Sequence, residues 1–443
     1  GVYRMTDAAR DSLLANPLRQ NISSSGDVNG ALFNADFLTA DDFIRVPTRL
    51  NASRQSANLV AKLDVATNET TQLTFGATGA VQLNNEFDRG RSLMNWENNN
   101  QTSRLDWRGY VKFSQRFVDE EGEGSSGGLK NVFYSIMADY SQSYFKRQDV
   151  SHGDNFFRYG HVGKFDVFQE NSYGYNDASG RYVHNGWKDT LVTFAASPYN
   201  PELAAINTQF FSLFDNNSGA TFGPGGPQFE PGPYTSLLEV QNGNALLNGQ
   251  NPSSTYGLWS YVGAQGNSYN IFNDQQFRVS AAGSGDIGDH ALQIGFEYEQ
   301  RRDAFFNLSP VGLWTLARLT ANSHIKEIDT SDSTVTNVGT DYYVTYDRLL
   351  GDNQFEFDAN LREALNAEDR ELINIDAIDP DFYSLDMFGA DDLLNQGSNY
   401  VSYGGYDPYG NKTNNRPTIE EFFTETNDAG YNTRPIGAYE PIY

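Results

Sequence analysis

The stretch RLDWRGYVKFSQRF, residues 104–117, alternates between apolar and polar side chains, and its polar positions carry charges of both signs. The apolar positions are Leu105, Trp107, Val111, Phe113 and Phe117, and the charged positions are Arg104, Asp106, Arg108, Lys112 and Arg116. Because a β-strand points successive side chains to opposite faces, one face of this strand is apolar and the other is ionic. Soluble sandwich strands usually carry milder polar groups, so the pattern favours lipid on one side and a watery lumen on the other.

Seven further stretches show a similar alternation and are predicted to be β-strands. They cover residues 57–65, 71–83, 131–144, 157–169, 189–196, 272–282 and 290–302. On the apolar side we expect four residues to face lipid: Phe75, Trp107, Val111 and Phe113. On the other side we expect seven residues to be hydrated or to face a plug: Lys62, Asp64, Arg104, Asp106, Arg108, Lys112 and Arg116. A lysine in place of Phe113 should therefore be costly, and a change at Lys112 much less so.

The connections between these strands alternate between short and long, which predicts that the long ones share one side. The short ones are 66–70, 119–130 and 283–289, and the long ones are 84–103, 197–271 and 303–443. Outer-membrane barrels sort their loops in this way, with short periplasmic turns and long outer loops. Two segments fit loosely, because 145–156 is short for an outer loop and 170–188 is long for a turn. Residues 303–443 show no convincing strand pair.

These patterns divide the chain into three regions. We expect residues 1–55 to form an extracellular loop region, residues 56–302 to hold the transmembrane strands with the long outer loop 197–271, and residues 303–443 to form a large acidic extracellular region. Helix starts at Ser309-Pro310 and at Thr418–Glu421, a capping box, predict that the long loops are partly helical.

Composition narrows the possible functions. The 443 residues include no cysteine, which excludes disulfide scaffolds, thiolate metal sites and cysteine nucleophiles. Mean hydropathy is −0.57, and no segment approaches the roughly 20 apolar residues of a membrane helix. The net charge of −26 argues against a nucleic-acid partner, because phosphate binding needs a cationic surface. Residues 303–443 hold 25 acidic and 8 basic side chains, so the negative charge is concentrated there.

The sequence motifs that suggest an enzyme have a simpler explanation. Residues 283–288, GSGDIG, match a dinucleotide fingerprint, but they join two strands and are predicted to be a hairpin turn. The five histidines are dispersed, and no pair has the spacing of a zinc site. A Ser-His-Asp triad stays open because its members need not be near in sequence. We predict no catalytic residue, no cofactor-binding residue and no enzymatic activity.

Two groups of loop residues are candidate binding sites. The acidic residues Asp376, Asp379 and Asp381 could bind calcium, which takes hard oxygen ligands, although a solvated acidic loop is the simpler alternative. The aromatic residues could stack on sugars or contact a peptide, or they could pack loop against loop. They form two sets, Tyr256, Trp259, Tyr261 and Tyr269, and Tyr400, Tyr403, Tyr406 and Tyr409.

Several segments resemble the large TonB-dependent outer-membrane receptors of Bacteroidetes, the Oar-like group. The longest is HALQIGFEYEQRRDAFFNLSPVGLWTLARLTANSHI, residues 290–325. The others are NVFYSIMADYSQSY (131–144), YGHVGKFD (159–166), PDFYSLDMFGADDLLNQGSNYVSYGGYD (380–407) and TRPIGAYEPIY (433–443). The resemblance implies a 22-stranded barrel closed by a plug and energised by a TonB complex of the inner membrane. No plug or TonB box is recognisable in the chain.

Together these observations predict an all-β protein: about eight antiparallel strands of a transmembrane β-barrel, which the resemblance implies has 22 strands, with long, partly helical extracellular loops. We expect a middle portion, with the remaining strands and the plug supplied by another chain or by further sequence, because open sheet edges are untenable in lipid. The expected location is the bacterial outer membrane, with the loops facing outward.

The expected function is ligand binding at the loops followed by import. The expected partners are outer-membrane lipid, the rest of the barrel, the TonB complex, and a surface lipoprotein or a secreted client. A structural or adhesive cell-surface β-protein is the first alternative. A secreted glycan-active enzyme is the second, but the many acidic residues do not single out the carboxylate pair that it would need. The ligand stays open among siderophores, oligosaccharides, peptides and proteins.

Overall fold

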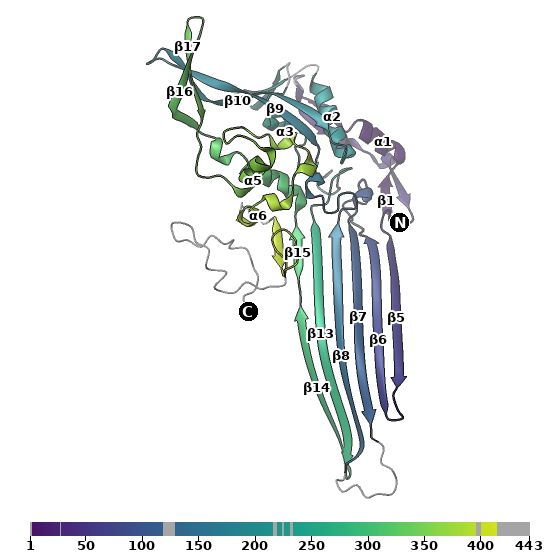
Figure 1. The fold of residues 1–443 in the computed structure, drawn as a ribbon. Coiled ribbons are helices and arrows are strands. Elements are labelled where there is room, and N and C mark those ends of the chain that lie inside the picture. Colours follow the sequence, from purple (N-terminus) through teal and green to yellow (C-terminus); the bar gives the residue numbers. More distant parts are fainter. Residues whose placement is uncertain are drawn as a thin grey trace.

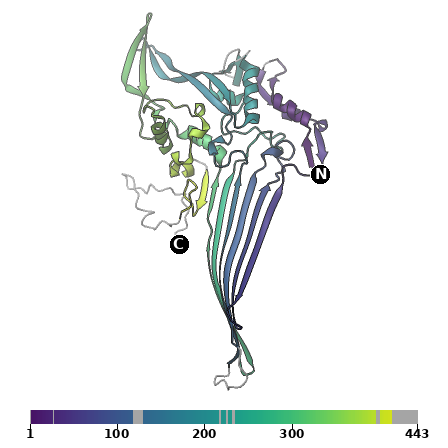
Figure 2. The ribbon, with the colours of Figure 1, turned by 45° about the vertical axis from the view of Figure 1, so that its right-hand side comes forward.

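The computed structural model describes residues 2–26, 28–117, 129–215, 219–223, 226–230, 234–395 and 400–413. The protein is predominantly β, and nearly all of its strand pairs are antiparallel. It consists of a long blade of strands and a head of mixed structure at one end of that blade (Figure 1). The 45° view shows the blade as one thin, twisted layer (Figure 2).

Six long strands make up the blade, in the order β5-β6-β7-β8-β13-β14. They are β5 (Arg54–Ala66), β6 (Thr71–Asn85), β7 (Gln101–Arg116), β8 (Leu129–Gln148), β13 (Tyr269–Ile287) and β14 (His290–Arg302). Two short strands extend the same sheet at the head end, because β15 (Phe305–Leu308) pairs with β13 and β18 (Val401–Gly404) pairs with β15. Six of the eight expected strands therefore lie in this sheet, and its two other members, β15 and β18, were not expected.

The long connections of the blade all lie at its head end, as the loop lengths predicted. At the far end, β5 and β6 are joined by residues 67–70, β7 and β8 by 117–128, and β13 and β14 by 288–289. At the head end, 86–100 joins β6 to β7 and 149–268 joins β8 to β13. The GSGDIG motif ends in the two-residue hairpin turn, where Gly288 has φ +59°.

The expectation that residues 157–169 and 189–196 belong to the membrane sheet is wrong. Strands β9 (Gly163–Asn176) and β10 (Arg181–Ala196) instead form a separate four-stranded sheet in the head, in the order β16-β17-β10-β9. Its other members, β16 (Ile328–Val338) and β17 (Asp341–Arg348), are the strand pair that we did not expect within 303–443. The physical reason is that β8 pairs directly with β13 along its length, which leaves no place between them. Residues 170–188 fitted poorly as a turn because most of them are strand.

Smaller elements complete the head. Three two-stranded sheets pair β1 (Val2–Met5) with β4 (Phe43–Val46), β2 (Leu18–Ile22) with β3 (Val28–Phe33), and β11 (Gly219–Gly223) with β12 (Gly226–Glu230). The α-helices are α1 (Asp7–Ala15), α2 (Pro201–Asp215), α3 (Leu237–Asn242), α4 (Leu313–Thr320), α5 (Glu356–Leu365) and α6 (Ala390–Asn395). The 3₁₀ helices are Asn34–Phe37, Ala40–Asp42, Trp96–Asn98, Phe156–Arg158, Pro310–Gly312, Ser323–Ile325, Ile375–Ala377, Pro380–Phe382 and Leu385–Met387.

The helix expected after Ser309-Pro310 is present as a 3₁₀ turn that leads into α4, although the Ser309 side chain makes no capping hydrogen bond. The helix start expected at Thr418–Glu421 and the segment TRPIGAYEPIY lie outside the described residues. None of the helices in the described ranges has the length and hydropathy that a membrane-spanning helix needs.

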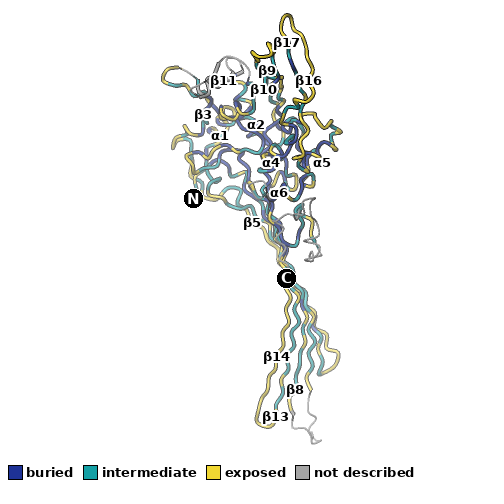
Figure 3. Tube along the Cα trace, turned by 90° about the vertical axis from the view of Figure 1, so that its left-hand side faces the viewer, coloured by how far each residue is buried: buried dark blue, intermediate teal, exposed yellow. Residues whose placement is uncertain are grey.

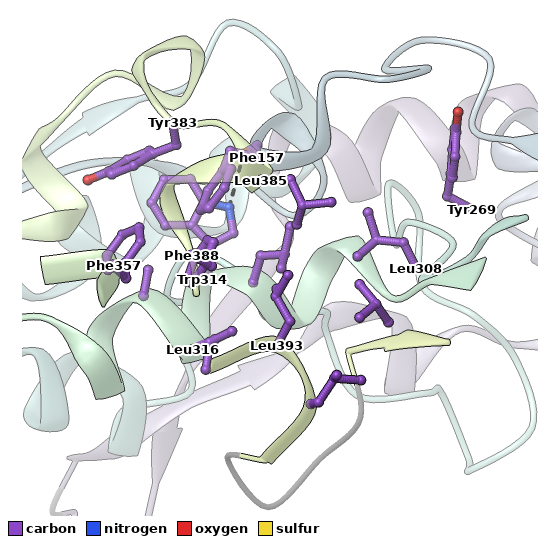
Figure 4. Close-up of a cluster of buried hydrophobic side chains, with 14 of the residues drawn as sticks. Phe157, Tyr269, Leu308, Trp314, Leu316, Phe357, Tyr383, Leu385, Phe388 and Leu393 are labelled. Atoms are coloured by element: carbon purple, nitrogen blue, oxygen red, sulfur yellow. Dashed lines mark hydrogen bonds between the residues drawn. The ribbon is translucent and has the colours of Figure 1, made fainter. Parts of the chain in front are cut away.

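The two hydrophobic cores of the described residues lie in the head, and only two of their buried members, Tyr269 and Ile271 at the head end of β13, belong to the blade (Figure 3). The first core surrounds Trp314 of α4: Trp314 contacts Phe157, which stacks on Phe388, and Phe388 in turn stacks on Phe357 (Figure 4). The second core joins the N-terminal elements to α2 and to the first residues of β9. Helix α5 shows why these segments fold as they do: Phe357 and Leu361, four residues apart, are both fully buried, and Asn366 ends the helix in the left-handed conformation.

Candidate functional site: a two-faced sheet

The blade has one apolar face that runs without interruption across all six strands. The strand register aligns Leu63, Phe75, Val111, Ala138, Val279 and Tyr298 in one row. The adjoining row contains Val65, Leu73, Phe113, Ile136, Ala281 and Phe296. The alternation that the sequence shows in single strands is therefore kept in register over the whole sheet.

This apolar face is uncovered. Ile294 is 75% exposed and Leu59 is 69% exposed, and large apolar side chains of every strand in the blade are at least partly open to solvent. Among the described residues, no second layer packs on either face of the blade. Soluble monomers rarely expose contiguous apolar patches larger than a few hundred Å². The face therefore needs another apolar phase, such as lipid or a partner surface.

The height of the apolar face matches the apolar core of a membrane. On β7 it runs from Leu105 to Phe117, twelve steps of about 3.3 Å, or about 40 Å along the strand. At the tilt of about 35–45° found in outer-membrane barrels, this length projects to about 30 Å, the thickness of the hydrocarbon core of a bilayer. Aromatic rings lie near both ends: Trp107 contacts Tyr140 at a ring-centroid distance of 5.3 Å, and Phe117 contacts Tyr134 at 6.1 Å. Membrane proteins place aromatic residues at these two boundaries.

The opposite face is ionic and is organised around Asp139 of β8. The Asp139 side chain is only 3% exposed and accepts hydrogen bonds from Arg108 Nε (3.0 Å) and Arg278 Nε (2.9 Å). The three residues belong to three adjacent strands, β7, β8 and β13. A carboxylate shared by two guanidinium groups stabilises the polar face because each charge is paired as it leaves bulk water.

The other charges of this face form shorter pairs. Lys62 lies 2.8 Å from Asp64, and Arg104 lies 2.9 Å from Asp106. Lys112 and Arg116 form no ion pair with the described residues and are partly or fully exposed. The register thus confirms that all seven residues expected on the polar side share one face, opposite Phe75, Trp107, Val111 and Phe113.

A hollow of about 640 Å³ opens in the blade near the head. Its polar walls include Asp106, Arg108, Asp274, Arg301 and Asp303, which come from β7, β13 and the end of β14. Both signs of charge line it, and most of these side chains keep contact with water.

The three candidate calcium ligands do not converge on one point. Asp376 is buried and pairs with Arg318 (2.7 Å), Asp379 lies 3.3 Å from Lys164, and Asp381 is held by Arg158. The hydrogen bond from Arg158 keeps the pKa of Asp381 below its usual value. Each carboxylate thus has its own cation, and no group of three acidic or histidine side chains in the described ranges could hold a metal ion. Calcium binding at these residues stays a prediction.

The two aromatic sets serve mainly to pack the head. Tyr261 belongs to the second core, and Tyr269, Tyr403 and Tyr406 belong to the first. Tyr400 and Tyr409 pack against the first core, and Trp259 packs against the second. Tyr256 is exposed and donates a hydrogen bond to the carbonyl of Asp36. Neither set forms a joint stacking surface, although Trp259 also lines a pocket of the head.

A buried histidine makes the head sensitive to acid. His161 is 1% exposed, stacks on Trp314 and hydrogen-bonds Ser197 through Nδ1, and burial lowers its pKa to about 4. Between pH 6.5 and 4 the unfolded chain binds a proton at this site that the folded head does not, so stability falls as the pH falls. We expect a loss of about 2–3 kcal/mol between pH 7 and pH 4.5 from this residue.

Denaturant titrations followed by tryptophan fluorescence at the two pH values measure this effect. The His161→Asn variant should show a smaller pH dependence than the wild type. An identical pH dependence in the two proteins would contradict the assignment.

Two functional-looking groups were not singled out from the sequence. Asp139 and Arg278 alternate as ordinary polar strand residues, and only the pairing of β8 with β13 brings them together. Asp358 and Arg362 are four residues apart, a spacing typical of a helical ion pair, but their burial follows from the segments that cover α5. The first pair can be found only from the strand register, and the burial of the second pair can be found only from the tertiary fold.

Comparisons with known proteins identify no family. No protein-family model matches the chain, and no curated protein matches its sequence significantly.

Proposed function

We propose that the chain is part of a TonB-dependent receptor of the outer membrane, which binds a ligand at its head and imports it through a plugged barrel. The observation that carries this proposal is the blade itself: a continuous apolar face of membrane height, an ionic face opposite, and all long connections at one end. Contact with lipid accounts for the apolar face, and a hydrated lumen accounts for the ionic face. An extracellular head accounts for the long connections at one end.

The free edges of the sheet support a wider barrel. Strand β14 pairs only with β13 and strand β5 pairs only with β6 among the described residues, so each presents one unpaired edge. Unpaired N–H and C=O groups in lipid cost several kcal/mol each, so a spanning sheet must be closed. Strand β18 runs antiparallel to β15 and indicates the direction in which the next strand would leave the head. The wide barrel and the plug are implied by the family resemblance.

The test is an uptake experiment with the complete gene in its native cells. A deletion strain and the wild type are grown in defined medium, and depletion of siderophores, oligosaccharides and peptides is compared. We expect one class to remain in the medium of the deletion strain, and a protonophore to abolish its uptake by wild-type cells. Uptake that is unchanged by the deletion would contradict the importer.

An adhesive protein is the second candidate, and one observation favours it. The four-stranded head sheet extends away from the blade, and its edge strand β16 is exposed over almost its whole length (Figure 1). Such an edge can pair with a strand of another protein. In this case deletion should reduce attachment to surfaces or to other cells without changing any uptake. The same two strains therefore separate the two functions.

A further inference from the structure

One cavity of the head has a lining that contrasts with the acidity of the chain. It measures about 710 Å³ and is lined by Val2, Tyr3, Ala40, Phe43, Arg49, Phe87, Arg89, Ser92, Leu93 and Trp259. Four aromatic rings form much of its wall, and its two charged residues are both arginines. The protein carries a net charge of −26, so a pocket with two cations and no acidic residue stands out.

The two arginines have no carboxylate partner. Arg49 lies with its guanidinium carbon 4.3 Å from the centroid of the Phe87 ring, and neither it nor Arg89 forms an ion pair with any described residue. Both are exposed residues of the pocket lining, so their charges are available. By contrast, Arg4, Arg10 and Arg147 elsewhere in the head and upper blade each pair with an acidic side chain.

We propose that this pocket binds a ligand that carries a phosphate or carboxylate group on an apolar or aromatic body. The guanidinium groups of Arg49 and Arg89 would hold the anion, since arginine pairs with planar or tetrahedral oxyanions through two parallel N–H donors. The rings of Tyr3, Phe43 and Trp259 would cover the apolar part. The net negative charge of the whole chain argues against an anionic ligand, but the lining of this pocket contains two arginines and no acidic residue.

A lipid headgroup and a soluble molecule are the two sources of such an anion, and the place of the pocket in the fold bears on the choice between them. Arg49 precedes β5 by five residues, and Phe87 follows β6 by two. Leu105, at the head end of the apolar face of β7, is in register with Val81 of β6, and Phe87 lies six residues beyond Val81, or about 20 Å of extended chain. The polar layer on each side of a bilayer is only about 5–8 Å deep, so the pocket lies at or beyond the outer limit of the lipid headgroups. The lipid source rests on the proposed membrane position, but binding of a soluble anion does not.

The first arm of the test uses a soluble probe. The full chain in a non-ionic detergent is titrated with 1-naphthyl phosphate and with neutral 1-naphthol, and binding is measured by calorimetry. We expect the phosphate to bind more tightly than the naphthol and the Arg49→Gln/Arg89→Gln double variant to weaken phosphate binding at least tenfold. Arg45→Gln, on the neighbouring strand β4 and outside the pocket lining, is the matched control and should bind as the wild type does.

The second arm uses nanodiscs of phosphatidylcholine with and without phosphatidylglycerol that has brominated acyl chains. Quenching of Trp259 that is strong in the wild type and weaker in the double variant would show lipid at the pocket, and Trp259→Phe gives the background from the other tryptophans. Binding of the soluble phosphate without quenching identifies a free anionic ligand, and quenching identifies a headgroup. Equal affinities for phosphate and naphthol, or an unchanged double variant in both arms, would overturn the proposal.

Discussion

A lysine in place of Phe113 is expected to destabilise the folded, membrane-inserted protein by about 2–4 kcal/mol. Phe113 lies on the apolar face near the middle of the band that runs from Leu105 to Phe117. A lysine there would bring its ammonium group into the hydrocarbon near the bilayer midplane, where this cost is largest. The free energy of unfolding is measured by urea titration of the protein refolded into lipid vesicles.

The matched control introduces the same side chain one residue further along the same strand. Ser114 lies on the ionic face, in register with Gln72 and Ser135, so the Ser114→Lys ammonium group stays hydrated. We expect its cost to remain within about 1 kcal/mol, as for changes at Lys112. Equal costs at positions 113 and 114 would show that the two faces see the same environment, contrary to the assignment.

The Asp358→Ala substitution is expected to destabilise the head by about 3–5 kcal/mol. The Asp358 side chain is fully buried and accepts hydrogen bonds from the Arg362 guanidinium (2.8 Å) and the Asn322 backbone N–H (2.6 Å). Without this carboxylate the Arg362 charge, itself only 5% exposed, would remain in the interior with no counter-ion. Because α5 packs into the first core, the loss should spread to Trp314 and its neighbours.

Tryptophan fluorescence during guanidinium denaturation follows this effect. The control is Asp332→Ala on β16, an exposed carboxylate with no ion pair among the described residues, which should change stability by no more than about 0.5 kcal/mol. A loss at Asp358 no larger than that at Asp332 would mean that the buried ion pair contributes nothing to the head.

The strands and faces of the blade could be predicted from the sequence because they depend on residues that are close together in the chain. The alternation in 104–117 assigns each side chain to a face, and a turn such as 288–289 requires β13 and β14 to be neighbours. Both are properties of a single hairpin. The faces of Phe75, Val111 and Lys112 could therefore be assigned from the alternation alone, and the register confirms them.

The head was harder to predict because its contacts join distant segments. Residues 163–176 alternate like a blade strand, but their neighbours in the sheet are residues 181–196 and, through β10, residues 341–348. Nothing in the alternation says which sheet a strand joins. The pocket between Tyr3, Phe87 and Trp259 could not be predicted for the same reason, because its walls come from four segments that only the tertiary fold brings together.

The central claim is that lipid covers one face of the blade and water the other, and nitroxide scanning along β7 tests it most directly. The chain has no cysteine, so a single cysteine can be placed at each position from 107 to 113 in the complete protein and spin-labelled in native outer membranes. We expect accessibility to oxygen to peak at 107, 109, 111 and 113, and accessibility to a water-soluble nickel complex to peak at 108, 110 and 112. Two profiles without this period of two, or high nickel accessibility on both faces, would contradict the account.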